Sequence, residues 1–480
     1  MSAGLPWEVL VNRKIFEMEY AVRGPIPRRA NELREMGQAI IPCHLGNPQA
    51  LGQPPISFYR EVLSLVEHPM LIERERKLKA LYGDGLLNQL ESSNFYSDYV
   101  LDVSKQFLSQ METGMGAYSE SNGAKFIREA VASFIDRRDG SNDLEGQRSQ
   151  VDQIFITNGA SEAVRYVIDL LIDDVDDGIM IPIPQYPLYS AAIKRGGGSQ
   201  VDYFLDEEAG WTIDVQQLHS AINEAQGRGV NVKAIVVINP GNPTGAVLDK
   251  KTIREVITFA KNRGLAIIAD EVYQENVYET EFVSFARVLG RDEVPLFSVH
   301  STSKGFYGEC GHRGGYLEIR NPPNVKGTNI SFSDLVLKQA SVNICSNTVG
   351  QLMVYLLVSP PLEGSETYRC FIEERKFILE ELYQKASMIR DGFEYMDGMS
   401  CFGSTGAMYL FPRMDKLPAG TTDFEYCMRL LEHTGLVTVN GEGFGQKKDS
   451  NHLRIAFLPP RDVIEKVLPE WITFHNAYVN

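Results

Sequence analysis

The most informative part of the chain is the segment from Ser301 to Gly315, which contains a lysine among small hydroxyl residues. Lys304 follows Ser301 and Ser303, and Arg313 comes nine positions after the lysine. A lysine amine can form a Schiff base with an aldehyde, and an arginine fork can bind a phosphate through parallel hydrogen bonds. The segment therefore suits an aldehyde cofactor that carries a phosphate. A surface lysine in a Gly/Ser loop is the simpler interpretation, which other segments must overturn.

Pyridoxal phosphate is such a cofactor, and its ring requires an acid at the nitrogen, a donor at the phenolic oxygen and an aromatic side chain on one face. Asp270 ends an apolar run and suits the nitrogen. Asn242 lies in a loop that two prolines and two glycines make rigid, and it suits the phenolic oxygen, as does Tyr273. Tyr186 follows another apolar run and suits the ring face. Taken singly, Asp270 also fits a helix N-cap, and the tyrosines also fit a core.

The phosphate group of such a cofactor requires backbone N–H groups at the start of a helix, together with side-chain donors. The run Gly159-Ala160-Ser161 meets the first requirement, because it stands between an apolar run and a helical pattern. The two serines and the arginine of the lysine segment would complete the phosphate site.

Short apolar runs alternate with helical patterns through the middle of the chain, which predicts an α/β layer with a mostly parallel sheet. Ligands of such sheets gather at the carboxyl ends of the strands. Because the candidate residues follow apolar runs, we expect them to meet at one edge of the sheet. The predicted strands span residues 154–157, 179–183, 234–238, 265–269 and 297–300, and the clearest helices span 162–172 and 251–263.

The two ends of the chain differ from its middle. The first 75 residues are helical with prolines in loops, and a long helix over 366–396 precedes short strands such as 407–411. We therefore predict a large domain over residues 76–344. Residues 1–75 and 345–480 are predicted to form a smaller α+β domain together.

Composition narrows the classes of function. The chain has 480 residues, 43% hydrophobic and 23% charged, and its net charge of −16 argues against nucleic acid as a partner. No apolar run approaches the roughly 20 residues that cross a bilayer, and Met1 to Val11 do not resemble a secretory signal. Six cysteines without a Cys-x-x-Cys pair indicate free thiols and no metal site. We expect a cytoplasmic protein, with an organellar form whose targeting peptide has been removed as the open alternative.

The order of these segments resembles the aspartate-aminotransferase fold, fold type I of the pyridoxal phosphate enzymes. Within that fold the chain is similar to the alanine aminotransferases over nearly its whole length. The wider superfamily has eight positions between lysine and arginine, whereas here His312 stands at the eighth and Arg313 at the ninth. The form Gly-Glu-Cys-Gly-x-Arg-Gly-Gly is that of alanine aminotransferases. Further shared segments are 20–24, 46–48, 52–56, 118–119, 341–351 and 453–456.

The resemblance implies a seven-stranded sheet in the large domain and a role for each candidate residue. Lys304 would form the Schiff base and move the proton, and Arg454 would bind the substrate carboxylate together with Asn242. Gly46 would line the substrate mouth, and Tyr118 would reach the phosphate of a neighbouring subunit in a homodimer. The other implied contacts are Ala160, Ser161, Ser301, Ser303 and Arg313 to the phosphate, Asn242 and Tyr273 to the phenolic oxygen, Asp270 to the ring nitrogen, and Tyr186 to the ring face.

The activity that the resemblance implies is transfer of the amino group from L-alanine to 2-oxoglutarate, giving pyruvate and L-glutamate by a ping-pong route through pyridoxamine phosphate. Three alternatives remain open. In the first alternative, glyoxylate is an additional or preferred acceptor of the amino group. A lyase of the same fold, such as an aminocyclopropane-carboxylate synthase, is the second, and the nine-position spacing argues against it. A non-enzymatic binding or regulatory protein is the third, and it should lack Lys304 or Arg454.

Overall fold

The computed structural model describes residues 12–16, 18, 24–87, 95–141, 148–447 and 450–480. Met1 to Val11, which were considered for a secretory signal, lie outside the described residues. The same holds for Tyr20 to Arg23, which belong to the first segment that carries the resemblance.

A seven-stranded sheet forms the centre of the structure, with the order β1-β7-β6-β5-β4-β2-β3. Neighbouring strands from β3 to β6 are parallel, whereas β7 is antiparallel to both β6 and β1. Six strands therefore run in one direction and β7 runs in the other, which confirms the mostly parallel sheet. The strands are β1 Ile154–Thr157, β2 Asp177–Ile183, β3 Ser199–Phe204, β4 Asn231–Ile238, β5 Ala266–Asp270, β6 Leu296–Ser301 and β7 Gly315–Arg320.

The five predicted strands are confirmed to within a few residues, but β3 and β7 were not predicted. The two predicted middle helices are confirmed as α7 and α10, and the long helix as α14, which ends at Phe393. The helices are α1 Arg13–Phe16, α2 Pro25–Glu35, α3 Ser57–Glu67, α4 Met70–Leu87, α5 Asp98–Gln110, α6 Lys125–Asp139, α7 Ala160–Leu171, α8 Leu188–Gly196, α9 Val215–Gly227, α10 Lys250–Arg263, α11 Phe285–Leu289, α12 Phe332–Val342, α13 Thr348–Val358, α14 Glu366–Phe393, α15 Asp423–Thr434 and α16 Arg461–Val479. Single 3-10 turns are η2 Gln49–Leu51, η4 Val151–Gln153, η5 Cys310–His312 and η6 Gly441–Phe444.

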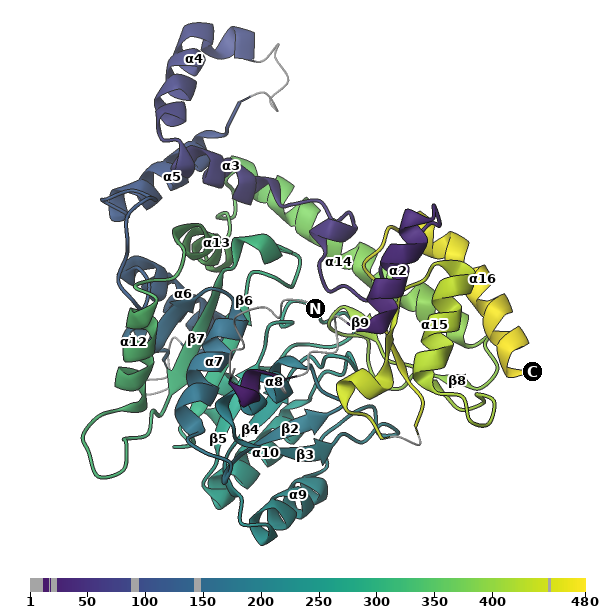
Figure 1. The fold of residues 1–480 in the computed structure, drawn as a ribbon. Coiled ribbons are helices and arrows are strands. Elements are labelled where there is room, and N and C mark those ends of the chain that lie inside the picture. Colours follow the sequence, from purple (N-terminus) through teal and green to yellow (C-terminus); the bar gives the residue numbers. More distant parts are fainter. Residues whose placement is uncertain (1–11, 17, 19–23, 88–94, 142–147, 448–449) are drawn as a thin grey trace, which may run out of the picture.

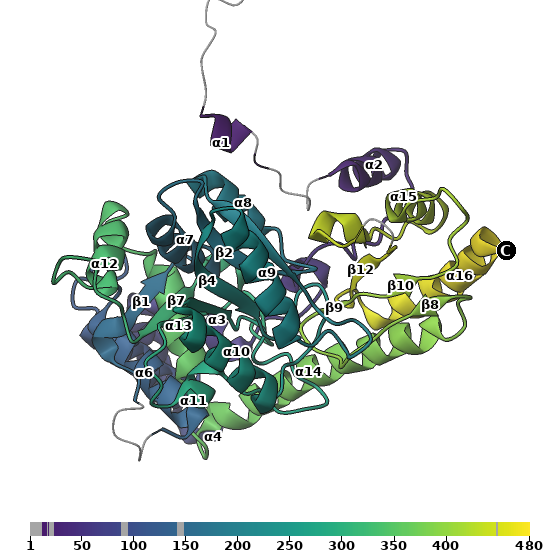
Figure 2. The ribbon, with the colours of Figure 1, turned by 90° about the horizontal axis from the view of Figure 1, so that it is seen from below.

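Helices cover both faces of the sheet, as the uniformly apolar central strands require. Ala234 and Val236 of β4 pack with α7 and α8 on one face. Ile235 and Val237 of the same strand pack with α9 and α10 on the other. Figure 2 shows α7 and α8 above the strands and α10 and α11 below them. Both faces are thus shielded from water.

The two ends of the chain meet beside the sheet. In Figure 1 the purple α2 lies next to the yellow-green α15, with α16 close by, and α14 extends from them towards α3. Ile41 pairs with Leu436 in a parallel bridge, which joins the N-terminal segment to the C-terminal one. The division of the chain at residues 76 and 344 stays a prediction. Short strands in this part are β8 Met399–Ser400, β9 Tyr409–Leu410, β10 Arg413–Met414, β11 Val439–Asn440 and β12 Leu453–Ala456.

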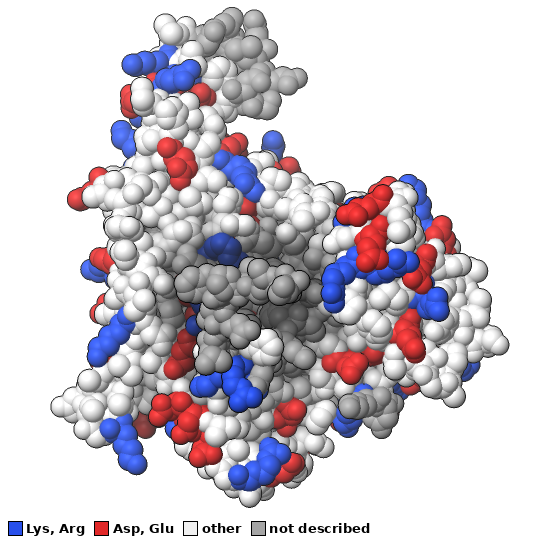
Figure 3. All heavy atoms as spheres, viewed as in Figure 1, with Lys and Arg blue, Asp and Glu red and all other residues white. Residues whose placement is uncertain are grey.

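The surface is acidic without being segregated. On the face drawn in Figure 3, red and blue side chains of the described residues are interspersed, and no continuous basic area appears. Among the described helices, none is long and apolar enough to cross a membrane.

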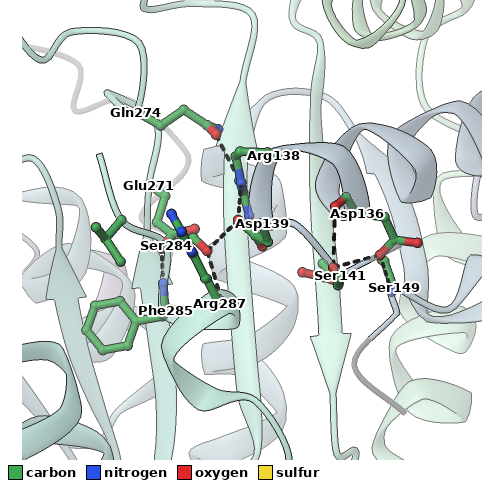
Figure 4. A network of polar contacts seen from close by, with 12 residues as sticks. Asp136, Arg138, Asp139, Ser141, Ser149, Glu271, Gln274, Ser284, Phe285 and Arg287 are labelled. Carbon is green, nitrogen blue, oxygen red and sulfur yellow. Dashed lines mark hydrogen bonds and ion pairs between the residues drawn. The ribbon is translucent and has the colours of Figure 1, made fainter. Parts of the chain in front are cut away.

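A buried polar network fastens α6 to the turn that follows β5 (Figure 4). Arg138 lies 2.8 Å from the Asp139 carboxylate and donates to Gln274 Oε1 at 2.8 Å. Ser284 donates to Asp139 at 2.8 Å, and Glu271 accepts a 2.7 Å hydrogen bond from the first N–H of α11. Removing one partner of a buried ion pair costs about 3 to 5 kcal/mol, because the other charge stays buried. The network therefore holds firmly the residues next to Asp270.

This network predicts how stability depends on pH. Burial raises the pKa of Glu271 to about 7, above the roughly 4.3 of an unfolded glutamate. The stabilisation from the protonated carboxyl is therefore complete below about pH 4 and is lost as the pH rises through 7. A Glu271→Gln variant keeps the acceptor for the α11 N–H but does not titrate. Between pH 5 and pH 8 we expect the variant to gain about 2 to 3 kcal/mol relative to the parent protein.

Urea unfolding of both proteins at the two pH values measures this difference. A free-energy difference that stays constant between pH 5 and pH 8 would show that Glu271 does not titrate in this range.

Candidate active site

A cavity of about 270 Å³ lies between the carboxyl edge of the sheet and the segment that contains β9 and β12. It brings together every predicted site residue except Tyr118. The predicted residues that line it are Gly46, Ala160, Ser161, Tyr186, Asn242, Asp270, Tyr273, Ser301, Ser303, Lys304, Arg313 and Arg454.

Tyr118 does not line the cavity. It lies between α5 and α6, and its side chain is 75% exposed. An exposed large aromatic residue is compatible with a contact to another molecule. Its contact with a neighbouring subunit stays a prediction.

Strand direction explains why these residues converge. Ala160 follows β1, Tyr186 follows β2 and Asn242 follows β4, while Asp270 is the last residue of β5. Since these strands are parallel, their carboxyl ends share one edge of the sheet. The reversed strand β7 starts at that same edge, so Arg313, two residues before its first residue, also reaches the cavity.

Lys304 reaches across to the N-terminal segment. Its Nζ donates a 2.6 Å hydrogen bond to the carbonyl oxygen of Gly46 and lies 5.8 Å from the centre of the Tyr273 ring. A Cβ on residue 46 would lie 3.2 Å from Nζ and 2.0 Å from the hydroxyl oxygen of Tyr409. Only glycine leaves room for both groups at this position.

Asp270 is a buried acid whose charge is not balanced. Its carboxylate accepts hydrogen bonds from the Tyr189 hydroxyl at 2.7 Å and from the Val272 N–H at 3.4 Å. Within the described part of the chain, no cationic side chain forms an ion pair with it, and burial raises its pKa to about 6. A buried carboxylate is costly without a cation. The site therefore fits a protonated ring nitrogen.

Arg313 and the start of α7 form one end of the cavity. The Arg313 Nη2 donates to the Asn158 carbonyl at 3.0 Å and to the Ser161 hydroxyl at 3.3 Å. A Cβ on Gly159, the N-cap residue of α7, would lie 2.4 Å from this nitrogen. The Ser303 hydroxyl is buried and has no hydrogen-bond partner among the described residues. N–H groups at a helix start, an arginine and an unpaired hydroxyl fit a phosphate group.

A buried acid explains how the loop between Lys304 and Arg313 accommodates its extra residue. Glu309 is 3% exposed, and its Oε2 lies 3.0 Å from Arg60 Nη2 and 2.8 Å from His312 Nδ1. The 3-10 turn η5 takes up the residues before Arg313, which adopts the left-handed conformation with φ of 56°. The Glu309 carboxylate thus ties the loop to α3 and positions Arg313.

Arg454 is held in one plane at the other end of the cavity. It donates to Asn242 Oδ1 at 3.1 Å and to the His44 carbonyl at 2.7 Å. Its guanidinium lies 4.2 Å from the centre of the Tyr409 ring and 5.0 Å from that of Phe444. Its Nε is buried and has no partner in the described structure. An oriented guanidinium with free donors fits a substrate carboxylate.

The site also contains residues that were not predicted, among them Tyr189, Tyr409 and His44. Tyr189 lies in the first turn of α8, three positions after Tyr186, and an apolar helix face would have predicted it as a core residue. Tyr409 stands in the apolar run 407–411, where an active-site tyrosine cannot be distinguished from a core residue. His44 contributes a backbone carbonyl, and no side-chain pattern predicts such a contact.

The contacts of Glu309 with Arg60 and His312, called here the Glu309 clamp, predict a change in the affinity for the cofactor. Glu309→Gln removes the negative charge that attracts Arg60, so the loop that carries Arg313 should lose its fixed position. We expect the dissociation constant for pyridoxal 5′-phosphate to rise about ten-fold, which corresponds to one charge-assisted hydrogen bond. Absorbance titration of the apoprotein measures this constant. Glu112→Gln, at an exposed acid, is the matched control, and equal constants for the two variants would contradict the clamp.

Comparisons with known proteins agree with this geometry. The sequence model of the family described as "Aminotransferase class I and II" matches residues 89–468. Alanine aminotransferase 2 of Panicum miliaceum is 41% identical over 98% of this chain and 97% of its own. Glutamate--glyoxylate aminotransferase 1 of Arabidopsis thaliana is 39% identical over 98% of this chain and 95% of its own. Several other relatives are named as mitochondrial alanine aminotransferases.

Solved structures lead to the same conclusion. The structure of an alanine aminotransferase from Pyrococcus furiosus superposes with a TM-score of 0.77 at 25% identity and covers 98% of this chain and 100% of that one. The nine-position loop, the buried acid at the end of β5 and the lysine after β6 therefore occur in a chain with the aspartate-aminotransferase fold. The protein belongs to the class I and II aminotransferase family, whose members depend on pyridoxal 5′-phosphate.

Proposed function

We propose that the protein is an alanine aminotransferase, which transfers the amino group of L-alanine to 2-oxoglutarate and gives pyruvate and L-glutamate. The observation that carries this proposal is the cavity itself, where Lys304 lies between a phosphate site at Arg313 and a carboxylate site at Arg454. A relative of that name is 41% identical over nearly the full length of both chains.

The residues of the cavity fit the cofactor at each of its groups. Asp270 would hold the ring nitrogen, and Asn242 and Tyr273, whose polar atoms lie 3.5 Å apart, would bind the phenolic oxygen. Tyr186 would lie against the ring face. The phosphate would be held by Ala160, Ser161, Ser301, Ser303 and Arg313. When bound, pyridoxal phosphate supplies an electron sink for the charge that develops at the substrate α-carbon.

Lys304 holds and moves the proton in this proposal. An amine that is freed by the substrate can accept the α-hydrogen as a general base and return it at a neighbouring carbon. The Gly46 carbonyl accepts a hydrogen bond from Nζ, so the freed amine has a fixed position beside the cavity. The substrate carboxylate is bound by Arg454, which Asn242 and the His44 carbonyl keep oriented.

Glyoxylate is a second candidate acceptor. A relative named glutamate--glyoxylate aminotransferase is 39% identical over 98% of this chain, nearly as similar as the alanine aminotransferases. The ratio of kcat/KM for glyoxylate to that for 2-oxoglutarate, with L-alanine as donor, distinguishes the two assignments.

A homodimer with shared active sites is part of the proposal, because the exposed Tyr118 is available to bind the cofactor phosphate of a second subunit. Mixing Tyr118→Phe subunits with Lys304→Ala subunits tests for shared sites, since mixed dimers would recover activity at one of two sites.

A cytoplasmic location is also proposed.

The proposed route predicts parallel lines in double-reciprocal plots of initial rate for L-alanine and 2-oxoglutarate. Each product leaves before the second substrate binds, so the two substrates never occupy the cavity together. Initial rates over a grid of both concentrations provide the measurement. Intersecting lines would contradict the route.

Removal of the lysine amine predicts loss of turnover. We expect Lys304→Ala to lower kcat by more than about 1,000-fold, because the variant lacks the general base. Lys105→Ala, at an exposed lysine of α5, removes the same charge and should leave kcat unchanged. Pyruvate release in a coupled assay measures both, and unaltered turnover in Lys304→Ala would refute the assignment.

A further inference from the structure

Tyr409 occupies a place in the cavity that the proposed function does not use. It lies in β9, is 2% exposed and lines the cavity beside Lys304 and Arg454. The centre of its ring lies 4.2 Å from the Arg454 guanidinium, and the centre of the Phe444 ring lies 5.0 Å from it. The ring therefore fixes the plane of the arginine, while the hydroxyl extends beyond it.

The hydroxyl of Tyr409 is free to donate a hydrogen bond. It accepts a 3.3 Å hydrogen bond from the Tyr273 hydroxyl, and no acceptor for its own proton is present among the described residues. Its oxygen lies 2.0 Å from the place that a Cβ on Gly46 would occupy. The absence of a side chain at Gly46 thus leaves this hydroxyl open to the cavity.

The electrostatic surroundings make this hydroxyl a strong donor. Burial by itself would raise the pKa of Tyr409, but the positive charges of Lys304 and Arg454 lower it below its ordinary value. The other titratable groups that act on it are the Tyr273 hydroxyl and the Cys310 thiol. The Tyr273 hydroxyl already donates its hydrogen bond to Tyr409. Of these two neighbouring tyrosines, Tyr409 is therefore the one that can donate to an anionic acceptor.

We propose that Tyr409 is a further substrate-binding residue, whose hydroxyl donates a hydrogen bond to the carboxylate that Arg454 binds. The inference rests on the proposed function, because it requires Arg454 to bind a carboxylate. The ring orients the arginine, and the hydroxyl adds a donor beside the Tyr273 hydroxyl, which itself lies next to Asn242. The tyrosinate form cannot donate this hydrogen bond, and its charge repels the carboxylate.

Propionate, which is L-alanine without its amine, is the probe, because it binds as a carboxylate and cannot react with the cofactor. Calorimetric titration of the holoenzyme should give an affinity about ten-fold weaker in Tyr409→Phe than in the parent protein, the loss expected for one hydrogen bond to a charged group. Tyr409→Leu should lose more, because the ring that orients Arg454 is absent. Tyr383→Phe, on the exposed side of α14, is the matched control and should bind as the parent does.

The pH dependence separates binding by the hydroxyl from a structural role of the ring. As the pH rises through the lowered pKa of Tyr409, the parent protein should lose affinity for propionate more steeply than Tyr409→Phe. Tyr409→Phe keeps Lys304, Arg454, Tyr273 and Cys310, the groups that act on Tyr409, and removes only the hydroxyl itself. The visible absorbance of the bound cofactor should be the same in both proteins, which checks that the fold is retained.

Equal affinities and parallel pH profiles in the parent protein and Tyr409→Phe would overturn the inference, and a loss confined to Tyr409→Leu would limit Tyr409 to orienting the arginine. Failure of the proposed function looks different. A parent protein that neither binds propionate nor releases pyruvate from L-alanine would overturn both proposals together.

Discussion

The direction of the strands is the constraint on which the site depends. Six of the seven strands are parallel, so the segments after β1, β2, β4, β5 and β6 all leave the sheet at one edge. Groups from distant parts of the chain are thereby brought within a few ångströms of each other without long connections. The reversed strand β7 completes the arrangement, since its first residues lie at the same edge and bring Arg313 opposite the start of α7.

The charged residues around the cavity are paired within the protein, whereas several polar groups that line it have no partner. The network around Arg138 and the Glu309 clamp pair their charges within the protein. By contrast, the Asp270 carboxylate forms no ion pair in the described structure. The Ser303 hydroxyl and the Arg454 Nε have no hydrogen-bond partner there. Buried polar groups without partners cost free energy. A ligand with a cationic ring, a phosphate and a carboxylate at matching places recovers that free energy, which accounts for both affinity and orientation.

In the proposed function, two arginines each bind an anion. Arg313 lies at an exposed end of the cavity and is positioned through backbone conformation, with φ of 56° and a loop tied to α3. Arg454 is buried and is positioned by contacts with the rings of Tyr409 and Phe444. The first arrangement would tolerate a solvated phosphate, whereas the second would exclude water from a bound carboxylate and strengthen each hydrogen bond to it.

Sequence alone determined the features that depend on short stretches of chain. The apolar runs predicted five strands, and the polar residues directly after them, such as Asn242 and Asp270, could be assigned to the site because chain direction places strand ends together. Tertiary structure alone decided the reversed direction of β7, the contact of Arg60 with Glu309 and the approach of Tyr409 to Gly46. These contacts join residues far apart in sequence, and each residue type there also fits an ordinary core or surface position. Only packing brings them together, so no local pattern could have identified them.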